Sequence, residues 1–413
     1  MPTQPASGNP ALAYVFAAAL YLLVALVMAL DASLVNFELL PYFSGIRWLR
    51  IHFITLATLT QVLFGALPLV VAQARGLPRP EMRWDIWASL NVGIVLLAVG
   101  IPPINSALII TGGTLVFVAT LLLIGQIARV GSESEVAPSE PSGKAFFISG
   151  LSYFTLGIIV GTGLWNGWMP VLHVETPLEV HIHANNWGLF SLVFAGLLIS
   201  MHKTWTERPF PRTEALRYIF WLLNAGAFGL IFGPWFGSTW LLVPGLAAHL
   251  VGVVWLLRLF IGSQVRSKDR WTPGITHLMV SYVWIIAPVL AAPLILFSIV
   301  DLPQADIEAL APQALVYGWA LQFGVAVVPY FLAKLMRPNA PAQLGGTWVS
   351  LALLNVGSAA LWLAVFAEPT RALWSGMAYL LWALALVPVV GQVFRILRTT
   401  PDLEPARSEV GAA

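Results

Sequence analysis

The amino-acid sequence predicts an all-α membrane protein with twelve transmembrane helices. Of its 413 residues, 58% are hydrophobic and only 10% are charged, whereas soluble domains have about 25% charged residues. The apolar runs are about 20 residues long, which suits helices that cross hydrocarbon and is too long for barrel strands. Cysteine is absent, which excludes disulfides, thiolate metal sites and cysteine nucleophiles.

Twelve apolar runs define the expected helices in order. The first follows ten residues without a basic side chain and is long enough to span, so we interpret it as a transmembrane helix and not as a cleavable signal peptide. The expected spans are 11–30, 48–74, 85–101, 106–128, 146–165, 180–201, 215–233, 239–261, 276–299, 313–335, 347–366 and 372–395. The whole chain, 1–413, is expected to form one integral membrane domain, with a flexible cytoplasmic linker at 131–144 and a disordered tail at 400–413.

The basic residues predict the orientation. Only Arg47, Arg50 and Arg371 of the 21 Lys and Arg lie on the side of the odd-to-even loops. Because cytoplasmic loops are rich in Lys and Arg, both termini are expected in the cytoplasm of a multi-pass, prokaryotic plasma-membrane protein. The opposite side is acidic, with Asp31, Glu38, Glu175, Glu179, Asp301, Asp306, Glu308 and Glu368.

Short signatures recur three times and predict a threefold internal repeat. "SLNVG", "LLNAG" and "LLNVG" place Asn91, Asn224 and Asn355 at intervals of 133 and 131 residues. A second marker places Phe64, Phe194 and Phe323 at intervals of 130 and 129, each before a basic loop that contains proline. A period this long indicates three four-helix units, approximately 11–130, 145–262 and 275–397, in pseudo-threefold-related arcs.

Histidines cluster near the outer ends of two equivalent spans. His52 lies in the second span, and His181 and His183 lie in the sixth, while the third unit has no histidine at this place. Residues two apart on a helix point about 200° apart, so His181 and His183 suit different sites on opposite sides of one helix. The alternative is that these are interfacial histidines bonded to loop carbonyls. His173, in the loop before them, is a further candidate ligand or gate. His249 is interpreted as a buried structural histidine, and His202 and His277 as interfacial anchors.

These motifs resemble the catalytic subunit of the haem-copper oxidase superfamily, including the C-type oxidases and nitric oxide reductases. "RWLRIH" is similar to the helix 2 motif whose histidine is an axial ligand of a low-spin haem, which implies that role for His52. "HANNWGLFSLVFAGLL" and the following stretch are similar to the helix 6 and 7 region, which implies a metal-ligand role for His183 or else His181. The resemblance also implies twelve helices in three arcs with both termini cytoplasmic.

The chain departs from that family where further metal ligands belong. "GPWFG" places Trp235 and Phe236 where helix 7 histidines stand, and "QALVYGWALQFG" has no histidine in helix 10. A second haem and a three-histidine metal centre of the usual kind are therefore not expected, and the protein is not interpreted as a proton-pumping terminal oxidase.

The remaining expectation is one b-type haem held by His52 and one of His181 and His183. The other histidine could hold a second haem or a copper ion. Arg47 and Arg50 are candidate partners for haem propionates, unless they extend to lipid headgroups, and Asn186 is a candidate donor to a propionate or ligand.

Three functions are compatible with this site. The first is electron transfer or small-gas chemistry, such as nitric oxide or oxygen handling, with a redox partner in the membrane or periplasm. The second is a cofactor-poor structural or assembly subunit, and the third is a metal-ion transporter. The lipid bilayer is the certain partner, and no nucleic-acid partner is expected.

Overall fold

The computed structural model describes residues 10–131, 141–265 and 271–399. Every regular element within these ranges is helical. In the part of the chain that the structure describes, eleven helices are long and apolar enough to cross a membrane, and the apolar helix Trp84–Gly100 is shorter. The described residues are therefore all-helical, as in a multi-pass membrane protein. The expected linker is described only at its ends, and the expected tail lies outside the described residues.

Each expected span corresponds to one helix or to consecutive helical pieces. The first third forms α1 (Pro10–Asn36), α2 (Ile46–His52), η1 (Phe53–Leu59), α3 (Thr60–Ala74), α4 (Trp84–Gly100) and α5 (Ser106–Arg129). The second forms α6 (Lys144–Asn166), α7 (Met169–Leu172), α8 (Pro177–His183), η2 (Ala184–Phe190), α9 (Ser191–Ser200), α10 (His202–Thr206), η3 (Thr213–Ala215), α11 (Leu216–Trp235) and α12 (Thr239–Val265). The last forms α13 (Pro273–Val280), α14 (Val283–Leu296), α15 (Gln304–Ala314), η4 (Leu315–Leu321), α16 (Gln322–Met336), α17 (Trp348–Phe366), η5 (Glu368–Thr370) and α18 (Arg371–Leu397).

Two helices extend beyond their expected ends because polar side chains there have partners. α1 continues to Asn36, where Asp31 pairs with Arg50 at 3.5 Å and Ser33 donates a hydrogen bond to the carbonyl of Gly376 at 2.9 Å. α15 begins at Gln304, well before the expected position 313. Hydropathy alone does not detect such ends, since their residues are polar.

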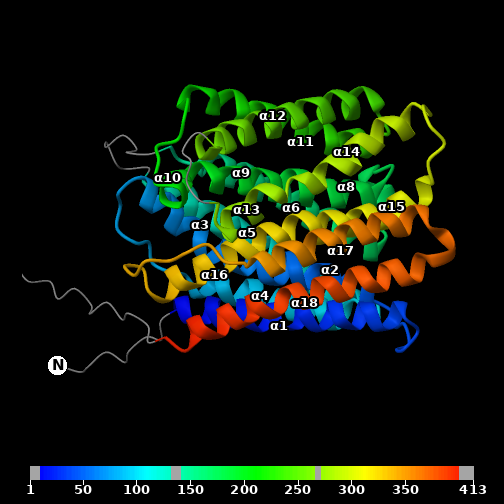
Figure 1. Ribbon diagram of the computed structural model, residues 1–413, viewed down its shortest axis with the longest axis horizontal. Coiled ribbons are helices and arrows are strands. Elements are labelled where there is room, and N and C mark those ends of the chain that lie inside the picture. Colours follow the sequence, from blue (N-terminus) through cyan, green and yellow to red (C-terminus); the bar gives the residue numbers. More distant parts are fainter. Residues whose placement is uncertain (1–9, 132–140, 266–270, 400–413) are drawn as a thin grey trace, which may run out of the picture.

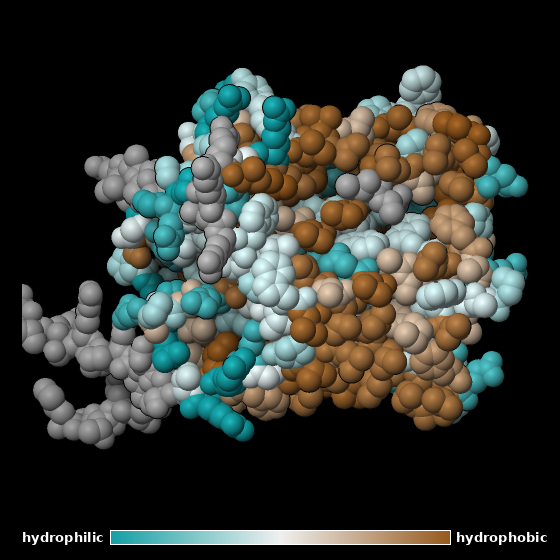
Figure 2. Space-filling view, viewed as in Figure 1, coloured by the Kyte–Doolittle hydropathy of each residue, from teal (hydrophilic) through white to brown (hydrophobic). Residues whose placement is uncertain are grey.

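The long helices lie side by side, and α1 begins at the same end of the bundle at which α18 finishes (Figure 1). We call the opposite end the far end. Apolar side chains dominate the middle of the face in Figure 2, and hydrophilic ones gather at the two ends. This distribution fits a protein whose middle is surrounded by lipid.

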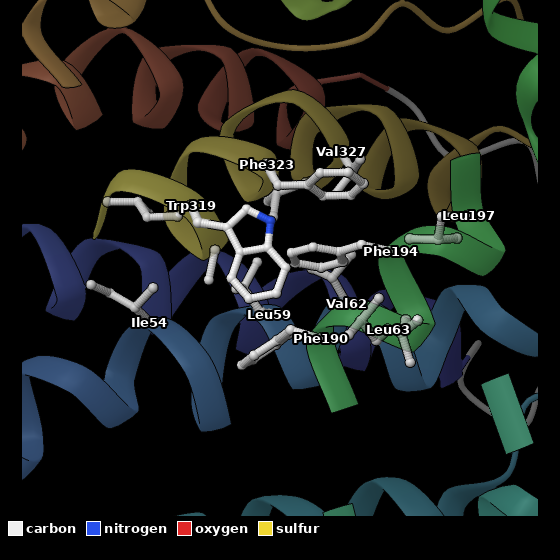
Figure 3. Close-up of a cluster of buried hydrophobic side chains, with 14 of the residues drawn as sticks. Ile54, Leu59, Val62, Leu63, Phe190, Phe194, Leu197, Trp319, Phe323 and Val327 are labelled. Carbon is white, nitrogen blue, oxygen red and sulfur yellow. The ribbon is translucent and has the colours of Figure 1, made fainter. Parts of the chain in front are cut away.

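Three spans form the centre of the bundle. They are α2–η1–α3, α8–η2–α9 and α15–η4–α16, and the apolar windows of these spans are 83%, 83% and 100% buried. Figure 3 shows Phe194 of α9 pointing toward Trp319 and Phe323, which both belong to the span α15–η4–α16. The rings of Phe194 and Phe323 stack at 3.8 Å, and Phe194 meets Trp319 edge-on at 5.6 Å. Aromatic side chains therefore fill the space between the central spans.

Each central span contains a seven-residue π-helical segment at the same relative place. The segments η1, η2 and η4 begin at Phe53, Ala184 and Leu315, which are 131 residues apart each time. In η1 the hydroxyl of Thr58 donates to the carbonyl of Phe53, five residues earlier. His52 and His183 directly precede their π segments and are equivalent in this register. The phenylalanine markers, at intervals of 130 and 129, do not occupy equivalent positions in it.

The three repeated asparagines bond to side chains from the first helix of their own unit. Tyr21 donates to Oδ1 of Asn91 at 2.8 Å, and Trp284 donates to Oδ1 of Asn355 at 2.8 Å. In the middle unit, Ser149 donates to Oδ1 of Asn224, and Tyr153 donates to its backbone carbonyl. The donors Tyr21, Tyr153 and Trp284 are 132 and 131 residues apart. The sequence repeat is therefore matched by a recurring contact.

Replacing Asn355 by alanine is expected to destabilise the fold by about 0.5–2 kcal/mol, because the indole N–H of Trp284 then loses its acceptor inside the bundle. Unfolding in mixed micelles of dodecyl sulfate measures this change. Val356→Ala is the matched control, since the Val356 side chain is 57% exposed on the same helix. Equal effects of the two substitutions would contradict the assigned role of the bond.

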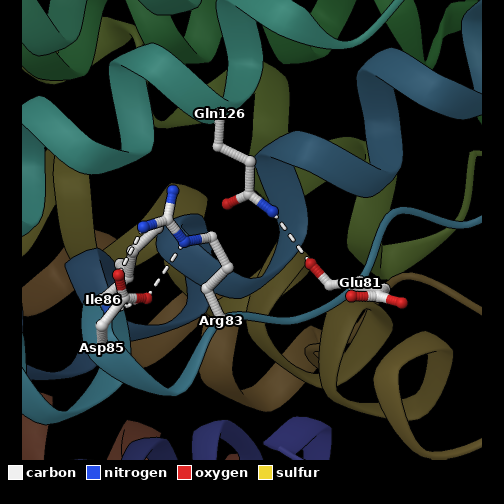
Figure 4. A network of polar contacts seen from close by, with 5 residues as sticks. All are labelled: Glu81, Arg83, Asp85, Ile86 and Gln126. Atoms are coloured by element: carbon white, nitrogen blue, oxygen red, sulfur yellow. Dashed lines mark hydrogen bonds and ion pairs between the residues drawn. The ribbon is translucent and has the colours of Figure 1, made fainter.

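A polar network fixes the start of the shorter apolar helix α4. Figure 4 shows Arg83 turned toward Asp85, and Gln126 of α5 turned toward the backbone of Glu81. Nε of Arg83 donates to Asp85 at 3.0 Å, and Nε2 of Gln126 donates to the carbonyl of Glu81 at 2.9 Å. The hydrogen bonds to Asp85 raise the pKa of Arg83. These contacts hold the loop before α4 against α5.

Candidate functional site

A cavity of about 610 Å³ lies between the first two central spans and the outer helices α4, α5 and α6. It reaches from Tyr42, in the loop after α1, down to Thr60 and Phe190 within the bundle. Most of the lining is apolar, with a few polar groups. Ligand pockets have volumes of roughly 300–1,000 Å³ and this kind of lining, so the cavity is large enough for a sizeable planar cofactor.

Two histidines line this cavity from opposite spans. The imidazoles of His52 and His181 have ring centres 6.1 Å apart and planes inclined by 25°. Nδ1 of His52 is 2.8 Å from the carbonyl oxygen of Trp48, and Nδ1 of His181 is 2.8 Å from that of Gly157. A carbonyl only accepts hydrogen bonds, so each Nδ1 carries the proton and each Nε2 has a free lone pair. Metal-ligating histidines have this pattern.

Neighbouring residues hold the two rings in place. The indole of Trp48 stacks on the His52 imidazole, with ring centres 4.1 Å apart and planes within 10°. Gly161 of α6 leaves room for the other ring, since a Cβ at this position would lie 2.5 Å from Cε1 of His181. Nδ2 of Asn185 donates to the carbonyl of His181 at 2.7 Å. Both imidazoles are therefore fixed by contacts outside any bound group.

His183 points away from the cavity, as its spacing from His181 predicts. Its Nδ1 donates to the carbonyl of Leu230 on α11 at 2.5 Å, and its ring lies 6.4 Å from that of Trp187. Trp187 in turn meets His249 at 5.1 Å, and His249 bonds to Ser191 at 3.0 Å. Trp187 is therefore a neighbour of both His183 and His249. Within the described residues no group of three or more His, Asp or Glu side chains could hold a metal ion.

The two candidate arginines face different sides of α2. Arg47 lines the cavity near the far end, and its Nη2 donates to the carbonyl of Ala309 at 2.8 Å. Arg50 does not belong to the cavity lining. It is buried, pairs with Asp31 at 3.5 Å and lies 5.6 Å from the ring centre of Tyr379. Only Arg47 can therefore serve a group bound in the cavity.

The remaining candidate residues differ in whether they line the cavity. Asn186 is 4% exposed and lines the cavity. His173 is exposed, ends the short helix α7 with a φ of 52° and does not line the cavity. His202 and His277 are buried and bond to loop carbonyls and serines at the end where the chain terminates. They hold loops in place, which agrees with an anchoring role.

Sequence reasoning missed the groups that orient the imidazoles. Gly161 belongs to the stretch "GTGLWNG" at 161–167, and a glycine-rich helix indicates close packing without revealing what packs against it. The carbonyls of Gly157 and Trp48 give no signal in the sequence, because every residue carries a backbone carbonyl.

Comparison with protein-family models finds no match, and comparison with curated proteins finds none either. The geometry of the cavity therefore carries the functional argument.

Proposed function

We propose that the protein binds one iron porphyrin, expected to be haem b, in the cavity, with His52 and His181 as its two axial ligands. The observation that carries the proposal is the pair of imidazoles 6.1 Å apart across a 610 Å³ cavity, each with Nδ1 bonded to a carbonyl. The absence of cysteine from the sequence means that the porphyrin is held without thioether bonds.

The ring separation fits one iron between two imidazoles. An imidazole nitrogen binds a first-row metal at about 2 Å and the ring centre lies about 1 Å behind it, so two such rings have centres roughly 6 Å apart. The separation of 6.1 Å in the structure agrees with this value. The resemblance to the haem-copper oxidase superfamily matched His52 with an axial ligand and His183, or else His181, with a metal ligand. Of these two histidines, the geometry favours His181 as the partner of His52.

Two axial imidazoles favour electron transfer over gas binding, because no iron coordination position stays open for a small ligand. The carbonyls of Trp48 and Gly157 make the two imidazoles more basic ligands. The role of the protein is then to hold a one-electron carrier near the far end of the bundle. A redox partner in the membrane or on the outer side completes this function.

The threefold arrangement supports a single haem. With α4 as the twelfth span, three units of four helices surround three equivalent spaces. Toward α18, the buried rings of Tyr317 and Trp382 stack at 4.1 Å and fill the space between their helices. Toward α11 and α12, the indole of Trp187 lies beside both His183 and His249 and occupies part of the space around them. We therefore propose no copper ion or second haem at His183.

The test is a reduced-minus-oxidised optical spectrum of the full-length protein, purified in a mild detergent. We expect a low-spin b-type spectrum that carbon monoxide and nitric oxide leave unchanged. A colourless protein that copurifies with a partner would favour a structural subunit. Metal-dependent flux in proteoliposomes would favour a transporter, for which the aromatic packing between the central spans leaves little room.

The basic loops support an orientation with both termini in the cytoplasm and the haem close to the outer surface. Because the chain has no cysteine, single cysteines can report this directly. A membrane-impermeant maleimide is expected to label Glu175→Cys in intact cells, and Glu214→Cys only after permeabilisation. Both glutamates are exposed. The reverse labelling pattern would invert the proposed orientation.

A further inference from the structure

A buried ion pair lies on the side of α2 that faces away from the cavity. Nη2 of Arg50 and Oδ2 of Asp31, on α1, are 3.5 Å apart, and the two side chains are 9% and 18% exposed. Charge-assisted hydrogen bonds between such groups are about 2.7–2.9 Å long. Within the described residues, Nε and Nη2 of Arg50 and Oδ2 of Asp31 are buried without a hydrogen-bond partner. The two charges therefore attract each other without a close hydrogen bond.

Stability is a weak reason for keeping this pair inside the bundle. Removing two charges from water is costly, and their attraction offsets that cost only when the hydrogen bonding between them is good. The guanidinium of Arg50 lies 5.6 Å from the ring centre of Tyr379, near the outer limit of a cation–π contact. Ionisable side chains within membrane spans are rare and mark functional places. The geometry of the pair therefore favours a functional role for its charges.

Arg50 belongs to the same helix as the proposed haem ligand His52. The two residues are two positions apart on α2, so their side chains leave the helix about 200° apart. His52 lines the cavity, whereas Arg50 faces α1 on the other side. A helix with its side chains is about 10–12 Å wide, and this width sets the scale of the distance between the guanidinium and a group bound at His52. Buried charges at such a distance are screened much less than exposed ones.

A fixed positive charge near a haem iron favours the reduced state, because reduction adds an electron to the iron. Resting on the proposed haem site, we propose that the Asp31–Arg50 pair sets the reduction potential of the bound haem. Arg50 raises the potential through its electric field across α2. Asp31 limits this increase, because its negative charge cancels part of that field. Neither side chain lines the cavity, so both act at a distance from the porphyrin.

The experiment is a spectroelectrochemical titration of the full-length protein in a mild detergent at low ionic strength. Asp31→Asn leaves the guanidinium charged, because arginine keeps its proton in proteins, so the midpoint potential should rise. The double variant Asp31→Asn/Arg50→Gln also lacks the positive charge, and its potential should fall below that of Asp31→Asn. Each step should change the ratio of reduced to oxidised haem at a fixed potential by roughly threefold to tenfold. A tenfold change is about 59 mV for one electron.

Two controls separate the electric field from a change in the fold. Asp306→Asn removes the acid of the Arg371–Asp306 pair, whose side chains are 35% and 31% exposed, and solvent screening should leave the midpoint potential unchanged. The double variant Asp31→Glu/Arg50→Lys keeps both charges and should keep a potential near that of the wild type. A purely structural effect would lower the haem content without moving the potential in opposite directions at the two steps.

The outcomes distinguish this role from the haem site on which it rests. A midpoint potential that is the same in the wild type, Asp31→Asn and the double variant, or that moves in one direction at both steps, would overturn the role of the pair and leave the haem site standing. Should Asp31→Asn hold no haem, Arg50→Gln supplies the same test, and its potential should lie below that of the wild type. A wild-type protein that takes up no haem would overturn the haem site itself.

Discussion

Replacing His181 by alanine is expected to lower the haem content of the purified protein by roughly tenfold or more, because one of the two proposed axial bonds is lost. Haem that remains should be five-coordinate and should bind carbon monoxide. His52→Ala should have the same effect, since the two rings lie on opposite sides of one cavity. Pyridine haemochrome assay and optical spectra measure both quantities.

His183→Ala is the matched control for these substitutions. It removes an imidazole from the same helix, two residues away, but that ring bonds to Leu230 and does not line the cavity. The variant should keep the six-coordinate spectrum. Added imidazole should restore six-coordination to His181→Ala, because the substitution leaves space for a free ligand. Loss of haem from His183→Ala, with His181→Ala unaffected, would show that the axial pair has been assigned to the wrong histidine.

The membrane-spanning fold could be predicted from the sequence because the hydrocarbon of the bilayer requires every backbone polar group to be hydrogen-bonded within the protein. A run of about 20 apolar residues has one stable conformation in hydrocarbon, so each expected span corresponds to helical structure. The π segments were not predicted. They add a residue to a helical turn without changing hydropathy, and in η1 hydroxyls such as that of Thr58 bond to a carbonyl five residues back.

The candidate site was predicted only in part. The sequence does not show whether the sixth span turns His181 or His183 toward the span that carries His52. The spacing of His181 and His183 predicts opposite directions, and the structure agrees. The choice between them depends on how the sixth span is rotated about its axis. Close contact with α6 at Gly157 and Gly161 determines that rotation. Likewise, nothing in "RWLRIH" distinguishes Arg47, which faces the cavity, from Arg50, which pairs with Asp31.

Gly161→Ala provides the sharpest test of this packing argument. A methyl group there would lie 2.5 Å from Cε1 and 2.6 Å from Nδ1 of His181, closer than real side chains approach one another. The imidazole must then move, and it can do so only by straining or breaking its bond to the carbonyl of Gly157. We expect a several-fold loss of six-coordinate haem, within the roughly 10–100-fold range known for changes in the groups that orient metal ligands.

The substitution should not unfold the protein, because alanine stabilises a helix interior by roughly 0.5–1 kcal/mol relative to glycine, which offsets part of the strain. Gly125→Ala is the matched control. It has the same backbone effect in α5, and a Cβ there meets nothing within 4 Å. Thermal unfolding and optical spectra of both variants separate the two contributions. If Gly161→Ala keeps its full six-coordinate spectrum, His181 is not held against α6 as the structure has it, and its role as an axial ligand loses its main support.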